Sequence, residues 1–165
     1  MSGPDAVRVT TLVGVAPETA FAVFTEEVDA WWRREPRFRF SPGRTGVLRF
    51  ESGTGGRLVE IYDEGAGDLF EIGRVRIWEP PRRLVFGFRT ASFEREETTE
   101  VEVLFERAES GTRVTIEHRG WSGLPARHPA RRGLSGGAFT SMIGAQWGDL
   151  VVRLRHRLAG RSVSP

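Results

Sequence analysis

The sequence has no cysteine, no lysine and no long run of apolar residues. Without cysteine, the chain forms no disulfide and offers neither a thiolate nucleophile nor a sulfur ligand for zinc. A membrane-spanning helix needs about 18 consecutive apolar residues, and no stretch of that kind is present. No charged segment followed by an apolar one marks a secretory signal. We therefore expect a cytoplasmic protein without a membrane span.

A large excess of charge of either sign is absent as well. The 24 basic residues are all arginine and nearly balance 22 acidic residues, which leaves a formal net charge of +2. Because so small an excess attracts polyanions only weakly, we expect no nucleic-acid partner. The composition is that of an ordinary globular protein. We predict one domain over residues 1–160, followed by a disordered tail at residues 161–165.

The spacing of apolar residues predicts a helix near each end of the chain. The first helix should begin at Pro17, because proline fits the first helical position, and end near Pro36, because the residue before a proline avoids helical backbone. The second should run from Ala138 to Leu158. In the first helix the apolar side chains form one stripe at spacings of three, four and three residues: Phe21, Phe24, Val28 and Trp31.

About seven strands are predicted from the alternation of polar and apolar residues and from the glycine- and proline-rich turns between them. An alternating pattern is typical of an antiparallel sheet with one face exposed to water. Only the C-terminal helix is long enough to cover the apolar face. We therefore predict an α+β fold, in which a curved antiparallel sheet grips this helix and leaves a gap where a small molecule binds. The segments are AVRVTTLVGV, GVLRFES, RLVEIYD, FEIGRVRIWE, RRLVFGFRT, TTEVEVLFERA and TRVTIEHRGW.

This order of elements and several local strings resemble the START-like (SRPBCC) superfamily with its helix-grip fold. More narrowly, they are similar to the proteins homologous to the activator of the heat-shock protein 90 ATPase. The resemblance covers nearly the whole chain and implies either a cavity for a hydrophobic ligand or a chaperone partner, without a shared catalytic motif. The strings are VAPETAFAVFTEEVDAWW, GGRLVE, GRVRIWEPPRRLVFGF, TEVEV, GTRVTIEHRGW and GAQWGDLVVRL.

Two ionisable residues are candidates for chemistry. His118 shares strand parity with Ile116, so its imidazole should face the apolar side. There it could bond a ligand or move a proton near neutral pH. The alternative is a core histidine whose nitrogens are satisfied by hydrogen bonds. Glu60 faces the cavity if Leu58 and Tyr62 do, and faces solvent otherwise. We favour solvent for Glu60, because buried glutamates are rare.

Aromatic side chains dominate the predicted cavity wall. Only one residue of the pair Trp31 and Trp32 can continue the helical stripe, so the other should face the mouth of the cavity or solvent. In the hairpin that turns at two prolines, Gly87 suggests a bend or a close approach of strands. The predicted ligand-binding residues are Trp31, Trp32, Phe50, Tyr62, Trp78, Phe86, Phe88, His118, Trp121, Phe139, Ile143 and Trp147.

Two other patterns do not indicate sites. The string GLSGG matches the nucleophile pattern of hydrolases, but Ser135 and Asp149 on one helix would be about 21 Å apart. We therefore expect Ser135 to be a helix N-cap. The histidines, His118, His128 and His156, lack ligand spacing, so we predict neither a metal nor a cofactor.

Three functions remain open. We favour non-catalytic binding of a small apolar or amphipathic molecule between the sheet and the last helix. The first alternative is an enzyme of the cyclase or hydratase kind that uses His118 with Glu60. The second is an interaction module that stimulates a chaperone ATPase, as the resemblance implies. The sequence is compatible with a monomer or a homodimer.

Overall fold

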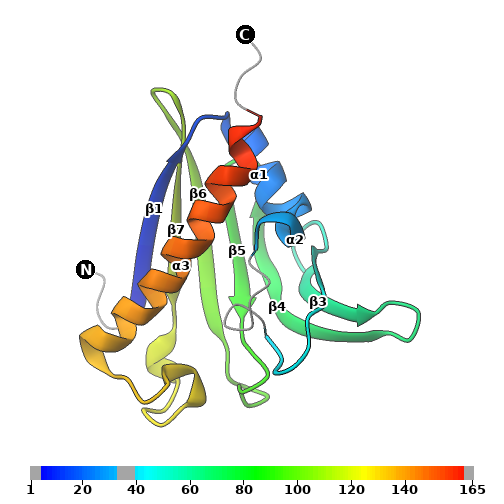
Figure 1. Cartoon of the computed structure of the whole chain (residues 1–165), viewed down its shortest axis with the longest axis vertical. Coiled ribbons are helices and arrows are strands. Elements are labelled where there is room, and N and C mark those ends of the chain that lie inside the picture. Colours follow the sequence, from blue (N-terminus) through cyan, green and yellow to red (C-terminus); the bar gives the residue numbers. More distant parts are fainter. Residues whose placement is uncertain (1–4, 33–39, 162–165) are drawn as a thin grey trace.

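Seven strands, most of them joined by short turns, pair into a single antiparallel sheet. In the computed structural model, which describes residues 5–32 and 40–161, their order is β1-β7-β6-β5-β4-β3-β2 (Figure 1). The strands after β1 follow one another as a meander, and β1 closes the far edge by pairing with β7. The predicted strand count is confirmed. The strands are β1 Ala6–Val13, β2 Val47–Phe50, β3 Arg57–Asp63, β4 Asp68–Glu79, β5 Arg83–Phe88, β6 Thr99–Ala108 and β7 Gly111–Arg119.

The long helix α3, Gly136–Ala159, lies diagonally across one face of this curved sheet (Figure 1). Its buried side chains recur at the spacing that the sequence predicted, so one stripe faces the sheet. The predicted α+β helix-grip fold is confirmed by this arrangement. In the described part of the chain, no helix is both long and apolar enough to cross a membrane. The stripe consists of Phe139, Ile143, Trp147, Leu150, Val151, Leu154 and Leu158.

The N-terminal helix is shorter than predicted and is broken in two. Helix α1, Pro17–Glu26, ends where Glu27 leaves the helical conformation, and α2, Val28–Trp31, adds a single turn. Trp32 is already extended, at φ −68° and ψ 130°. The predicted end near Pro36 lies outside the described residues, but the helix has stopped before it.

Strands β4 and β5 approach each other closely at two glycines. A Cβ atom on Gly73 of β4 would lie 1.8 Å from the carbonyl oxygen of Gly87 of β5, whereas a Cβ on Gly87 would meet nothing closer than 3.5 Å. The close approach predicted at Gly87 is therefore present, and the residue that must lack a side chain is its neighbour. A break in the β4–β5 register follows between Val75 and Ile77, and such a bulge increases the local bend.

This bulge also changes which way Trp78 points. Simple alternation places Trp78 opposite Val75, but the register break returns it to the core side. There its ring packs edge-on against Phe21 of α1, with 5.3 Å between the ring centres. Trp78 is thus part of the packing between α1 and the sheet.

The other face of the sheet carries paired charges. Arg119 of β7 bonds Glu100 at 2.7 Å and Glu102 at 2.5 Å on β6, and Glu117 at 3.1 Å on its own strand. Because cross-strand pairs of opposite charge stabilise neighbouring strands, this cluster supports the centre of the sheet. Further pairs extend it to the flanking strands: Arg8–Glu117, Arg83–Glu102 and Arg76–Glu100.

The end of α3 is fastened to the helices at the N-terminal end. Glu27, at the junction of α1 and α2, accepts bonds from Arg157 at 2.8 Å and from Arg161 at 2.6 Å. Arg161, predicted to begin a disordered tail, therefore makes an ion pair. The rest of the predicted tail, residues 162–165, lies outside the described residues.

Candidate functional site: an aromatic cavity beside His118

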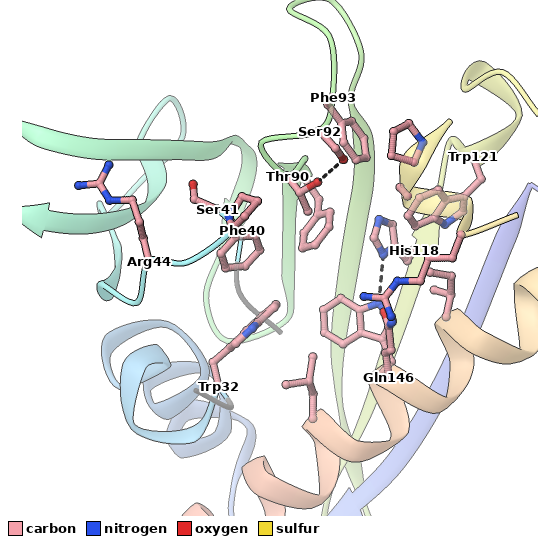
Figure 2. A pocket seen from close by; sticks show the side chains of 18 of the residues that line it. Trp32, Phe40, Ser41, Arg44, Thr90, Ser92, Phe93, His118, Trp121 and Gln146 are labelled. Carbon is pink, nitrogen blue, oxygen red and sulfur yellow. Dashed lines mark hydrogen bonds between the residues drawn. The ribbon is translucent and has the colours of Figure 1, made fainter. Parts of the chain in front are cut away.

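A cavity of about 850 Å³ lies between the sheet and α3 (Figure 2). Its walls come from five parts of the chain: Trp32 after α2, residues 40–45, the end of β5 with the loop to β6, β7 with the loop that follows it, and one face of α3. The inner wall is mostly aromatic. Its aromatic residues are Trp32, Phe40, Phe88, Phe93, His118, Trp121 and Trp147.

Tryptophan and phenylalanine rings hold one another in place around this wall. Trp32 meets Trp147 edge-on, with 5.5 Å between ring centres, and tilts against Phe40 at 5.8 Å. Phe88 bridges from Phe40 to His118, at 5.6 and 4.7 Å. Edge-to-face contacts of this kind restrict each ring, so the inner wall is preorganised.

His118 is buried at the centre of the wall, and both of its ring nitrogens are bonded. The indole Nε1 of Trp147 donates to Nδ1 at 3.0 Å, and Nε2 lies 2.7 Å from the hydroxyl of Thr99. Because an indole only donates, Nδ1 must be the acceptor, and the proton is on Nε2. The Thr99 hydroxyl accepts this proton and donates its own to the carbonyl of Phe88 at 2.9 Å.

Burial keeps this imidazole neutral. The side chain is almost completely enclosed, and desolvation lowers the pKa of His118 to about 3. Acting as a proton acceptor at Nδ1 would require the bond from Trp147 to break. His118 is therefore a core histidine with satisfied nitrogens that also lines the cavity.

Two loops at the mouth are joined by a second histidine. His128, in the loop after β7, contacts Glu97 in the β5–β6 loop through Nε2 at 3.0 Å. Its Nδ1 accepts from the backbone N–H of Ala130 at 3.1 Å, so Nε2 carries the proton. Phe93 packs edge-on against the same imidazole. This contact sets the distance between the two loops that form the rim.

Half of the residues predicted to bind a ligand line the cavity. Of the pair after α1, Trp31 continues the helical stripe, as the spacing predicted, whereas Trp32 lines the cavity and is buried, not exposed at its mouth or to solvent. Phe139 packs behind Trp121, with 5.1 Å between ring centres, instead of lining the space. The predicted residues on the lining are Trp32, Phe88, His118, Trp121, Ile143 and Trp147.

The other half lies elsewhere in the interior. Trp31 donates to the carbonyl of Phe24 at 3.2 Å and packs on that residue. Phe50 and Phe86 meet edge-on at 5.2 Å in the core. They share the apolar face of the sheet with Phe88, and strand parity cannot tell which position along that face borders the open space. The predicted residues away from the lining are Trp31, Phe50, Tyr62, Trp78, Phe86 and Phe139.

Glu60 differs from its prediction, because it is buried and not solvated. Its carboxylate accepts from the backbone N–H of Gly46 at 3.1 Å and from the hydroxyl of Tyr62. Burial, together with this bond, raises the pKa of Tyr62. Because Glu60 is not part of the cavity wall, the structure does not bring it together with His118 as an acid–base pair.

Several lining residues were missed by the sequence reasoning. All but one of them lie in irregular segments, where no period signals which side chains face inward; Gln146 lies on α3, beside the apolar stripe. The long loop after β7 was marked as functional by its length, but its individual lining residues were not predicted. Outside the cavity, Ser135 occupies the predicted N-cap position of α3, but its hydroxyl makes no cap bond. The missed residues with polar or aromatic side chains are Phe40, Ser41, Arg44, Thr45, Thr90, Ser92, Phe93, Arg132 and Gln146.

Comparison with known proteins identifies the family. The family model described as "Activator of Hsp90 ATPase homolog 1-like protein" matches residues 15–145. The chain belongs to this family. Membership confirms the resemblance to the START-like superfamily inferred from the sequence. No curated protein matches the chain.

Solved structures show the fold of this Activator of Hsp90 ATPase homolog 1-like chain at low sequence identity. Protein MLL2253 from Mesorhizobium loti is 16% identical with a TM-score of 0.66, over 96% of this chain and 99% of that one. The Aha1 dimer from Colwellia psychrerythraea is 14% identical with a TM-score of 0.62, over 93% and 95%. DynU16, a protein of the dynemicin biosynthetic locus, is 23% identical with a TM-score of 0.64, over 96% of this chain and 48% of that one.

Proposed function

We propose that this protein binds a small apolar or amphipathic molecule in the cavity beside His118 and does not transform it. The observation that carries the proposal is the preorganised aromatic wall around a space of about 850 Å³. Pockets for small molecules commonly measure roughly 300–1,000 Å³ and combine apolar walls with a few polar groups. This cavity has both properties.

The state of His118 favours binding over catalysis. A general base needs a free lone pair within reach of the substrate, and Nδ1 of His118 already accepts from Trp147. Glu60, the acid–base partner in the enzymatic alternative, bonds Gly46 and Tyr62 outside the cavity wall. Ligand binding needs neither group to change its protonation.

Displacement of a neutral fluorescent dye tests this proposal. N-phenylnaphthylamine should bind the protein with enhanced fluorescence, and fatty acids, sterols and polycyclic polyketides are then screened for displacement. Native mass spectrometry of the purified protein should show a bound mass for each molecule that displaces the dye. A protein that takes up neither the dye nor any member of the panel would refute the proposal.

A matched pair of variants on α3 locates the binding. Gln146→Trp adds a large ring at a position on the cavity wall, whereas Ala145→Trp adds the same ring at the neighbouring exposed position. We expect the first to weaken dye binding by about tenfold or more and the second to leave it unchanged. Equal effects would place the dye outside the cavity.

A chaperone partner and the cytoplasmic location stay predictions. Stimulation of a chaperone ATPase needs a partner surface of roughly 1,000 Å² in total, which a pull-down with a purified chaperone would reveal. The chain's oligomeric state is measured by sedimentation, with a monomer or a homodimer as the expected result. Failure to retain the chaperone leaves ligand binding as the proposed function.

A further inference from the structure

The cavity changes in polarity from its inner end to its mouth. Trp32, Trp121 and Trp147 are buried at the inner end, whereas Arg44 and Arg132 on the lining are exposed at the rim. A ligand that matches both ends must itself be amphipathic. Which polar group the ligand carries then follows from the charges at the rim, provided that the proposed binding function holds.

The charge on the wall is of one sign. Among the described residues that line the cavity, Arg44 and Arg132 are the charged ones, and neither aspartate nor glutamate occurs there, although the chain contains 22 acidic residues. Cationic groups at the edge of an apolar hollow attract an anion and repel a cation. The mouth therefore suits a negatively charged group.

Arg44 already has its partners. Its guanidinium lies 3.7 Å from the centre of the Tyr62 ring and pairs with Asp68. In Figure 2 its side chain points away from His118 and Trp32. The charge of Arg44 is therefore compensated by groups of the protein itself.

Arg132 differs from Arg44 in both its side chain and its backbone. Within the described part of the chain, no side-chain hydrogen bond or ion pair holds its guanidinium. It is also the one non-glycine there with positive φ, at 49°, a conformation that glycine adopts at no steric cost. This left-handed residue ends the 3₁₀ helix Pro129–Arg131, and its backbone N–H donates to the carbonyl of Pro129.

Arg131, the residue before Arg132, has a structural role in the same loop. The guanidinium of Arg131 donates to the carbonyl of Trp121 at 2.6 Å and to that of Leu124 at 3.1 Å. It also stacks on the ring of Phe139. Arg131 thus holds the loop together, while the neighbouring Arg132 keeps its charge at the cavity.

We infer that the ligand is an amphipathic organic anion, whose head group pairs with Arg132 at the mouth while its ring-containing or hydrocarbon body lies among the tryptophans. The shared chemistry is a carboxylate, sulfonate or phosphate ester on an apolar body. Arg132 selects the head group, and the aromatic wall binds the body.

Two dyes with the same aromatic body test this inference. Anilinonaphthalene sulfonate carries a negative charge, and N-phenylnaphthylamine is its uncharged counterpart. We expect wild-type protein to bind the sulfonate about five- to tenfold more tightly at low salt, because a hydrogen-bonded charge pair at a partly desolvated site contributes about 1 kcal/mol. Dodecanoate should likewise displace the neutral dye at lower concentration than dodecanol.

Three variants separate the role of Arg132 from folding. Arg132→Gln should abolish the preference for the anion and leave the affinity for the neutral dye unchanged. Arg132→Gly should do the same with an unfolding temperature no lower than that of the wild type, because glycine relieves the backbone strain. Arg127→Gln removes the same charge from the same loop at a position off the cavity wall, and should keep the preference.

The outcomes distinguish this inference from the proposed function. If wild-type protein binds both dyes equally, or if Arg132→Gln keeps the preference for the anion, the inference is wrong and the binding function stands. If neither dye nor any member of the ligand panel binds, the binding function fails and the inference fails with it.

Discussion

The indole N–H of Trp147 donates to Nδ1 of His118 at 3.0 Å, and this bond joins α3 to the middle of the sheet. It fixes the imidazole tautomer and directs the remaining proton to Thr99. A polar chain from helix to strand to strand thus runs beside the cavity. Such a network specifies how the helix sits on the sheet, because each buried partner is satisfied in one arrangement only.

The stability of the fold should depend on pH through His118. The unfolded chain takes up a proton on this residue below about pH 6.5, whereas the folded chain does so only near pH 3. The free energy of unfolding should therefore fall as the pH falls through this window, by roughly 1.4 kcal/mol for each pH unit well below 6.5. Urea denaturation at pH 7, 5.5 and 4.5, compared with His118→Gln, measures the effect.

His118→Gln is the reference for the wild-type protein in that experiment, because it lacks only the contribution of His118. Carboxylates whose pKa is lowered by arginine partners, Glu102 and Glu117 among them, titrate in both proteins. Wild type should thus lose more stability on acidification than His118→Gln does. Parallel curves for the two proteins would mean that His118 is not held neutral.

Removing the hydroxyl of Thr99 should leave the Nε2–H of His118 without its acceptor. We expect Thr99→Val to lower the free energy of unfolding by about 1–3 kcal/mol, the cost of an unsatisfied buried donor. The neighbouring exposed Thr98→Val is the control, with an expected change within about 0.5 kcal/mol. Chemical denaturation of both variants at pH 7 gives the comparison, and an unchanged Thr99→Val would show that the bond contributes nothing.

The two facing glycines should respond very differently to the same substitution. In Gly73→Ala the new Cβ would overlap the carbonyl oxygen of Gly87, so β4 and β5 must separate. We expect a loss of about 3 kcal/mol or more, or failure to fold. Gly87→Ala should stay within about 1 kcal/mol of wild type. Thermal unfolding of the two variants measures the difference. Equal losses of stability would contradict the close approach of β4 and β5 at Gly73.

Loss of Arg119 should leave three carboxylates facing one another across β6 and β7. Arg119→Met should lower the stability by about 1–3 kcal/mol at low salt, since each of these partly buried carboxylates then keeps only one arginine partner. The defect should shrink in concentrated salt, which screens the repulsion. Arg113→Met, an exposed change on the same strand, is the reference. If the loss of stability does not depend on salt, it comes from lost packing and not from repulsion between the carboxylates.

The sequence predicted those features that have a regular period. The stripe on α3 and the inward position of His118 were both read from spacing, because in helices and strands the period fixes which residues share a face. The break at Glu27 was not foreseen, since neither glycine nor proline marks it. The bulge that redirects Trp78 and the burial of Glu60 depend on how strands pair, which no single strand encodes.

The residues at the mouth of the cavity could not be predicted from the sequence for a different reason. Arg132 and Phe93 lie in loops, where the direction of a side chain follows from contacts such as the one between His128 and Glu97. Such contacts join segments about thirty residues apart, and the spacing within each segment says nothing of the other. Loop length alone marked the region as functional.

Beyond the cavity, the space beneath α3 is filled by Phe24, Phe50, Phe86 and Leu154, and Glu27 fastens the far end of the helix to Arg157 and Arg161. Within the described part of the chain, the rim is therefore the open side of the cavity. An amphipathic anion that enters there must insert its apolar part first, and it must leave with its charged group first. The position of Arg132 thus imposes one orientation on an amphipathic anion that passes through the rim.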